Sequence, residues 1–275
     1  MKEFKIRSSG AGQIMGGKLR IEATEVQLKN ILAMEARVKP MTEKQKIKYN
    51  EDIIIRDNPR DNPELPAGAK SFCQKWMREQ PELYNRRKEF SSKQTDKGNF
   101  CESLSIDFLN QQLRGGWVKR EDEDWVKCEE SKENDFITGT ADIVADDMII
   151  DIKNSWDSET FPLFDFGIKN KDYFYQLQCY MELYDKPRAA LAYTLMDAPL
   201  HLITREAKSQ AFHANVAFDD IFSQVHAHMT YGNVDPKFRK KIFYIDRDPS
   251  VIVDIEKRVK LCRSYIETLI EGVEK

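Results

Sequence analysis

Two aspartates and one lysine within residues 139–153 have types and spacing that could carry out chemistry. Side chains alternate between the two faces of a strand, so Asp151 and Lys153 lie on the same face. A two-residue turn at 146–147 would place Asp142 directly opposite Asp151 on a neighbouring antiparallel strand. Carboxylates that face each other at a Cβ separation of roughly 4.5–5.5 Å repel, and a divalent cation relieves the repulsion. Oxygen-only ligands suit Mg²⁺ or Mn²⁺, and Lys153 is close enough to act on a water there.

Two further polar side chains lie on predicted helices. Glu102 begins the apolar stripe of a helix expected over about 100–113, where a carboxylate without a partner is costly. Gln176 lies among tyrosines on a helix expected over about 171–184, where its amide could orient a water or a metal ligand. Structural alternatives stay open. Glu102 could cap its helix or pair with Lys97, Gln176 could bind a backbone group, and an isolated D-x-K is most often part of a solvated hairpin.

The order of these residues along the chain resembles the PD-(D/E)XK nuclease superfamily. Its pattern is a glutamate on a helix, G-x-x-D on a strand, D-x-K on the next strand and Q-x-x-x-Y on a following helix. The matching positions here are Glu102, 139–142, 151–153 and 176–180. The Q-x-x-x-Y element resembles the RecB-like branch, and within it the phage lambda exonuclease and YqaJ-type viral recombination nucleases. Those proteins also open with a short turn rich in Arg and Ser, here 5–10, and close with a strand and a long helix.

The resemblance implies an α/β (α+β) fold with a restriction-endonuclease-like core, in which helices flank a central mixed β-sheet. It implies a single nuclease domain over residues 1–275, with a helical N-terminal insertion at about 24–97. The chain departs from the family pattern at two positions. Asp151 replaces the commoner glutamate of the D/E-x-K element, and Ala141 replaces the proline before the first aspartate. Neither change removes a carboxylate, so we still expect activity.

The resemblance also implies a metal site and a reaction. Glu102, Asp142 and Asp151 would hold Mg²⁺, with the Ile152 carbonyl as a backbone ligand, and Mn²⁺ could substitute. Lys153 would position or deprotonate the attacking water. Such enzymes hydrolyse DNA phosphodiester bonds and typically digest one strand of a duplex from its 5′ end.

A second group of residues would bind and orient DNA, according to the same resemblance. Gln176 would orient the site, and Tyr180 would contact the DNA beside it. Arg7, Ser8 and Ser9 match the region of the family that captures the terminal 5′-phosphate. Family members also work beside a phage single-strand annealing protein and can assemble into rings around DNA. The expected partners are therefore double-stranded DNA, an annealing protein and further copies of the chain in a ring.

The remaining sequence predicts the elements that position these residues. Short strands separated by turns are expected from about 117 to 153, with helices before and after them. Strands flanked on both sides by helices indicate one α/β or α+β domain. The other expected elements are helices within 24–49 (ending at Lys39 and Pro40), over 69–84 and from 251 to 272, a loop over 56–66, strands over 189–195 and 241–247, and a polar helical segment to 231.

Composition limits the class of protein. The chain has 275 residues, 43 basic against 46 acidic, and a net charge of −3, which by itself argues against phosphate binding. A near-balance can, however, hide a basic groove. Two basic groups, the run at 237–241 and the earlier Arg86, Arg87, Lys88, Lys93 and Lys97, could line a DNA track or be solvated faces, and the earlier group is favoured because it runs into the helix of Glu102. Five scattered cysteines without a C-x-x-C pair exclude a zinc ribbon. With no apolar membrane span or signal peptide, the expected location is cytoplasmic, in a host cell if the protein is phage-encoded.

Two other functions remain open beside the exonuclease. A structure-specific endonuclease could use the same core, and a catalytically inactive DNA-binding module could keep the fold without turnover. The glycine-rich segment 12–18 fits most of a Walker A pattern, but Leu19 replaces the Ser or Thr that would bind Mg²⁺, so ATP binding is not expected.

Overall fold

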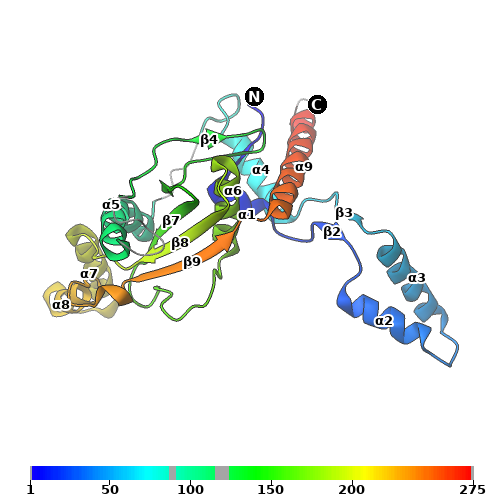
Figure 1. Cartoon of the computed structure of the whole chain (residues 1–275), viewed down its shortest axis with the longest axis horizontal. Helices are drawn as coiled ribbons and strands as arrows, with labels where there is room; N and C mark the ends of the chain where they lie inside the picture. Colours follow the sequence, from blue (N-terminus) through cyan, green and yellow to red (C-terminus); the bar gives the residue numbers. More distant parts are fainter. Residues whose placement is uncertain (1, 87–90, 115–123, 274–275) are drawn as a thin grey trace.

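The computed structural model describes residues 2–86, 91–114 and 124–273 (Figure 1). Its helices are α1 (Ala11–Ile14), α2 (Glu25–Glu35), α3 (Glu43–Asp57), α4 (Ala67–Arg78), α5 (Lys93–Leu113), α6 (Lys171–Tyr184), α7 (Leu200–Ala214), α8 (Phe218–His228) and α9 (Pro249–Val273), with 3₁₀ turns η1 (Ser8–Gly10) and η2 (Pro236–Phe238). Its strands are β1 (Ile6–Arg7), β2 (Arg20–Ile21), β3 (Arg60–Asp61), β4 (Lys132–Glu133), β5 (Ile137–Gly139), β6 (Ile143–Val144), β7 (Met148–Asn154), β8 (Arg188–Thr194) and β9 (Lys240–Asp246).

A four-stranded mixed sheet in the order β6-β7-β8-β9 forms the centre of the fold. β7 and β8 run parallel, whereas β6 and β9 are antiparallel to their neighbours. Parallel strands need a crossover, and α6 supplies it between β7 and β8. The predicted α/β fold with a central mixed sheet flanked by helices is therefore confirmed.

Alternation along β7 assigns its side chains to two different helices. Met148, Ile150 and Ile152 pack in a buried cluster with α5. Ile149 packs on the opposite face, in a cluster with residues of α6. Because side chains alternate, Asp151 and Lys153 share the face of Ile149 and face α6, whereas Asn154 lies on the other face and accepts from Ser105 of α5.

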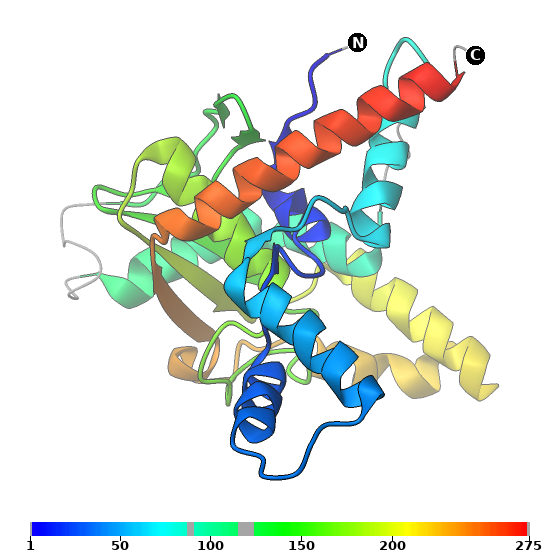
Figure 2. The same ribbon diagram turned by 90° about the vertical axis from the view of Figure 1, so that its right-hand side faces the viewer.

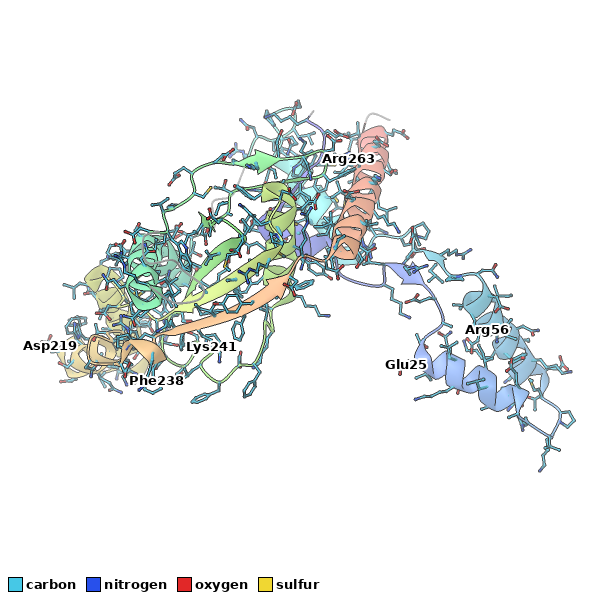
Figure 3. The ribbon with its side chains drawn as sticks, viewed as in Figure 1. Glu25, Arg56, Asp219, Phe238, Lys241 and Arg263 are labelled. Atoms are coloured by element: carbon cyan, nitrogen blue, oxygen red, sulfur yellow. The ribbon has the colours of Figure 1, made fainter. Side chains whose placement is uncertain are left out.

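A second body of structure surrounds the N-terminal turn. β1 pairs parallel with β5, and β5 pairs antiparallel with β4. Residues of β1, α1, α4 and α9 share one hydrophobic cluster, and α9 runs across this part of the molecule (Figure 2). Arg263 of α9 fixes the N-terminus by donating from Nε to the Phe4 carbonyl at 3.0 Å (Figure 3). The candidate phosphate-binding turn is thus held by the C-terminal helix.

Helices α2 and α3 form an arm that extends away from the sheet (Figure 1). Each begins with a capping box, from Thr24 with Gln27 and from Thr42 with Gln45. Only Ile31 of α2 and Asp52 of α3 are buried in these helices. The arm therefore has almost no core of its own, whereas α4, which lies within the expected insertion at about 24–97, packs against the body.

Several expected element limits differ from the structure. The first helix ends at Glu35 rather than at Lys39 and Pro40, because a second capped helix begins at Glu43. α5 begins seven residues before Phe100, where the Ser92 side chain caps it. The loop expected over 56–66 contains the end of α3 and strand β3, and the β-type segment expected at 125–126 is not a strand.

Other expectations fall outside the described residues or concern the membrane. The helix stop at Gly115 and Gly116 and the short strand at 117–118 lie outside the described part of the chain. Among the helices that the structure describes, none is long and apolar enough to span a membrane.

Arg258 of α9 holds the base of the arm. Its side chain is 1% exposed and donates to the carbonyls of Gly16, Lys18 and Glu64, each at 3.1 Å. These carbonyls lie just before β2 and just after β3, where the chain leaves and re-enters the body. The Arg258 guanidinium therefore binds both chain segments at the base of the arm, the one that leads into it and the one that returns from it, and holds them against α9.

Replacing this clamp should destabilise the protein. We expect Arg258→Met to lower the free energy of unfolding by about 2–4 kcal/mol, because buried carbonyls lose their donors. The neighbouring Lys257→Met is the matched control, since its ion pair with Asp61 (2.9 Å) is exposed and should cost less than about 1 kcal/mol. Urea denaturation measures both. Equal losses in the two variants would contradict the clamp.

Candidate active site

The β6–β7 hairpin has the register predicted from its turn. Ile143 pairs with Ile150 and Val144 with Ile149, and the Ala145 amide donates to the Met148 carbonyl at 2.9 Å. Continuing this register by one pair places Asp142 opposite Asp151. The predicted face-to-face arrangement of the two aspartates is therefore confirmed.

Asp151 is buried, with 1% of its surface exposed. Its Oδ1 accepts a hydrogen bond from Gln176 Nε2 at 3.1 Å. Its Oδ2 lies 2.6 Å from Lys153 Nζ in an ion pair but has no partner with hydrogen-bond geometry. A buried carboxylate is costly without a positive partner, and Lys153 supplies one here. A divalent cation could bind the same oxygen beside or in place of the ammonium.

Asp142 carries a strongly perturbed carboxyl group. Burial and then the nearby Asp151 charge raise the pKa of Asp142 to about 7. The Lys153 ammonium and a hydrogen bond from the Ile152 amide to Asp142 Oδ2, 2.7 Å long, partly offset that rise. The two aspartates thus hold more negative charge than their surroundings neutralise.

Lys153 lies between an acid and a ring. Desolvation lowers its pKa, but the Asp151 and Asp142 carboxylates outweigh this and raise the pKa of Lys153 above its usual value. Its Nζ also lies 4.9 Å from the centroid of the Tyr173 ring, within cation–π range. Beside these carboxylates Lys153 is an ammonium, which can donate hydrogen bonds and stabilise negative charge.

Glu102 approaches the aspartates from α5 but has a different partner. It pairs with Lys127 at 3.3 Å, not with Lys97 as one alternative suggested. Glu102 also contributes, weakly, to the raised pKa of Asp142, and it is the main cause of the raised pKa of Lys127. Within the described residues, no group of three or more His, Cys, Asp or Glu side chains is close enough to hold a metal. The structure thus brings Asp142 and Asp151 together and leaves Glu102 beside them.

Tyr180 and Ser8 lie next to Gln176. Gln176 Nε2 donates to the Tyr180 hydroxyl at 3.1 Å as well as to Asp151. A Cβ added at Gly139 would collide with Ser8 Oγ and with the Tyr180 ring, so both pack directly on this backbone. Ser8 is buried, and its hydroxyl donates to the Thr138 carbonyl at 3.2 Å.

Arg7 and Ser9, on either side of Ser8, are exposed. Of the three residues predicted to bind a 5′-phosphate, the structure therefore places only Ser8 against the site.

Sequence reasoning missed three residues of the site. Tyr173 shares a helix face with Gln176, but only the structure places its ring over Lys153. Lys127 lies in a segment without regular structure, so no periodicity links it to Glu102. Tyr184 is the third, because its hydroxyl accepts from the Ala141 amide at 3.3 Å and donates to the Glu130 carbonyl. A tyrosine four residues after Tyr180 on the same helix face was the available signal.

The donor set fits Mg²⁺ or Mn²⁺. Carboxylate and carbonyl oxygens at 142, 151 and 152 are ligands of the kind that these cations prefer, and Asp151 Oδ2 has an ion pair with Lys153 but no hydrogen bond. Mg²⁺ is commonly held by one or two carboxylates plus waters and phosphate, so two close aspartates are enough.

Comparisons with solved structures agree with this fold. A phage-related exonuclease from Haemophilus somnus 129PT matches with a TM-score of 0.64 at 23% sequence identity, over 99% of this chain and 97% of that chain. An alkaline exonuclease from Laribacter hongkongensis matches with a TM-score of 0.52 at 11% identity, over 98% and 91%. The fold is therefore that of phage-type exonucleases. No protein-family model and no curated protein matches the chain.

Lys97 of α5 supports the far end of β7. It is fully buried and donates to the carbonyls of Ser155 and Trp156 at 2.9 and 2.8 Å. Burial lowers the pKa of Lys97 to about 8, although Cys101, Asp157 and Asp197 act in the opposite direction. The residues directly after the candidate catalytic strand are thus held by a lysine that loses its proton near pH 8.

This lysine should make stability depend on pH. Below pH 8 the folded protein bears the cost of a buried ammonium; above it the folded state releases the proton while the unfolded state retains it. The free energy of unfolding of the wild type should therefore rise, relative to Lys97→Met, by about 2 kcal/mol from pH 7.5 to 10. Urea denaturation at both values measures the difference, and the exposed Lys208→Met is the control. A pH-independent difference between wild type and Lys97→Met would contradict this.

Proposed function

We propose that the protein is a Mg²⁺-dependent DNA exonuclease that hydrolyses phosphodiester bonds of linear duplex DNA. The observation that carries the proposal is the facing Asp142–Asp151 pair, in which Asp151 is buried, its Oδ2 forms an ion pair with the Lys153 ammonium, and the pKa of Asp142 is raised. A purely structural hairpin would not bury two facing carboxylates, because their repulsion destabilises the fold. The exonuclease fold is the second support.

The aspartates and their backbone would hold the metal. Asp142, Asp151 and the Ile152 carbonyl are the proposed ligands, with Glu102 reaching the site from α5 after exchanging its Lys127 partner. Bound Mg²⁺ would stabilise the charge that develops on the phosphoryl oxygens and lower the pKa of the attacking water.

The other residues of the site position the substrate and the ligands. Lys153 would orient the attacking water and stabilise negative charge, because its raised pKa keeps it protonated. Gln176 would hold Asp151 in place through Oδ1, and it also holds the Tyr180 hydroxyl. Ser8, packed against Tyr180 and Gly139, would contact a phosphate of the DNA, with Arg7 and Ser9 reaching it from the surface.

The finer features of the proposal come from the resemblance of the four motif elements. They include membership of the RecB-like branch of PD-(D/E)XK nucleases, digestion from 5′ ends, and a role in phage-type recombination in the host cytoplasm. The proposed partners are double-stranded DNA, a phage single-strand annealing protein and further copies of the chain in a ring.

Two substitutions test the chemistry. Asp151→Asn and Lys153→Met should each slow degradation of linear 5′-phosphorylated duplex at least about 100-fold, because one loses a metal ligand and the other loses charge stabilisation. End-labelled DNA resolved on denaturing gels measures the rate. Mn²⁺ should also raise the midpoint of thermal unfolding of the wild type but not that of Asp151→Asn.

Matched substitutions nearby serve as controls. Asp147→Asn, in the turn of the same hairpin, and Lys169→Met, on an exposed loop, should degrade DNA at the wild-type rate. Digestion by Asp151→Asn or Lys153→Met at the wild-type rate, with folding intact, would sink the proposal.

The form of the DNA separates an exonuclease from an endonuclease. The wild type should degrade linear duplex and leave covalently closed circular duplex intact, because an exonuclease requires an end. Gel electrophoresis of both substrates measures this. Linearisation of the circle would favour the endonuclease alternative, and comparing 5′- and 3′-labelled ends would give the polarity.

A further inference from the structure

A cavity of about 780 Å³ lies beyond the candidate active site. Its walls come from segment 156–164, which follows β7, and from α7, α8 and η2. Its volume is that of an ordinary ligand pocket, which typically measures roughly 300–1,000 Å³. None of the residues assigned to the metal site lines it.

Aromatic rings are the main feature of the cavity. Phe161 and Tyr231 are buried in its wall, whereas Phe164 and Phe238 are 84% and 47% exposed. Exposed rings beside a cavity indicate a surface that binds another molecule, because solvation of so much apolar area is unfavourable. The ligand should therefore have a flat apolar face.

Basic residues lie near the rim of the cavity. Phe238 lies within the basic run of Lys237, Arg239, Lys240 and Lys241, and Lys237 Nζ lies 4.8 Å from its ring centroid. Lys241 Nζ donates to the carbonyl of Leu163 at 3.2 Å, directly before Phe164 in the chain. Figure 3 shows Phe238 and Lys241 at the same end of the molecule as α8. Rings interleaved with cations are typical of surfaces that bind single-stranded nucleic acid.

Three acidic residues line the cavity: Asp157, Glu206 and the exposed Glu159. Glu206 forms an ion pair with Lys93, so its charge is compensated. Asp157 Oδ1 accepts from the amide and the hydroxyl of Thr160 at 2.8 and 2.9 Å. The acids and rings of the lining alone would suit a basic peptide, but the basic run beside the cavity, with Lys237 over the Phe238 ring, favours an anionic polymer instead.

The cavity is within reach of a strand bound at the metal site. Trp156, which lines the cavity, follows Lys153 by three residues, so their Cα atoms are at most about 10 Å apart. Packing also connects the two places. Phe161 belongs to a cluster that contacts Tyr193, whose ring lies edge-on to Tyr173, the residue under Lys153.

We propose that this cavity and its two exposed phenylalanines bind unpaired nucleotides of a DNA strand. Bases stack on Phe164 and Phe238, and the phosphates lie along the basic run at 237–241. The assignment rests on the proposed function, because degradation of one strand leaves its complement unpaired beside the active site.

Removal of the two rings tests the assignment. Phe164→Ala/Phe238→Ala should bind a fluorescein-labelled single strand of about 20 nucleotides at least about tenfold more weakly than the wild type. Its affinity for blunt duplex should change less than about twofold. Anisotropy titrations of the full chain, with divalent metal chelated by EDTA, measure both affinities without hydrolysis.

Three controls separate stacking from other effects. Phe212→Ala removes a ring that is 83% exposed on α7 but lies outside the cavity lining, and it should bind like the wild type. Phe164→Trp/Phe238→Trp keeps two stacking faces and should restore binding. Lys240→Met should lower the slope of log affinity against log salt by about 0.7, since it removes one phosphate contact.

The outcomes distinguish this assignment from the proposed function. Unchanged single-strand affinity in the double alanine variant overturns the cavity assignment, as do equal losses for single strand and duplex. If removal of the two rings weakens single-strand binding but the wild type degrades no linear duplex, the cavity assignment stands and the proposed function fails. Normal degradation together with ring-independent binding overturns the cavity assignment alone.

Discussion

The repulsion between the facing carboxylates of Asp142 and Asp151 is the constraint on which the site depends. The antiparallel strand pair brings these two carboxylates together where water solvates them only partly, so other interactions must offset their repulsion and desolvation. The Ile152 amide, the Gln176 amide group and the Lys153 ammonium do so. Ile152 and Lys153 belong to β7, whose aliphatic face packs against α5, and Gln176 belongs to α6 on the other face of the strand. The hydrophobic core thus supplies the rigidity that keeps two like charges close.

Local sequence features predicted the parts of the structure that local forces decide. The hairpin register followed from two adjacent turn aspartates and strict alternation, so Asp142 and Asp151 could be paired without coordinates. The limits of α6 were predicted to the residue. Its first turn is capped by the Asn170 side chain, and it ends at Asp185 in the left-handed conformation, both set by neighbours in sequence.

Long-range packing decides what could not be predicted. Lys127 meets Glu102 from a segment with no periodicity, and Lys97 is buried against the carbonyls of Ser155 and Trp156, which lie 58 and 59 residues later in the chain. Neither contact could be predicted from the sequence pattern around these residues. The arm is an intermediate case: its two capping boxes are local, yet its direction depends on Arg258, roughly 200 residues away. Sequence therefore predicts the catalytic pair better than the residues that neutralise and support it.

Charge illustrates why totals are a poor guide to function. A net charge of −3 argues against DNA if the molecule is treated as one surface. In the structure, two of the acids are Asp142 and Asp151, whose carboxylates face each other, so their charge belongs to the proposed metal site and not to the outer surface. Among the basic residues, those at 237–241 gather beside exposed rings at the end of the sheet that carries α7 and α8. Since screening limits exposed charges to about 10 Å, such local groupings, and not the sum, determine where a polyanion can bind.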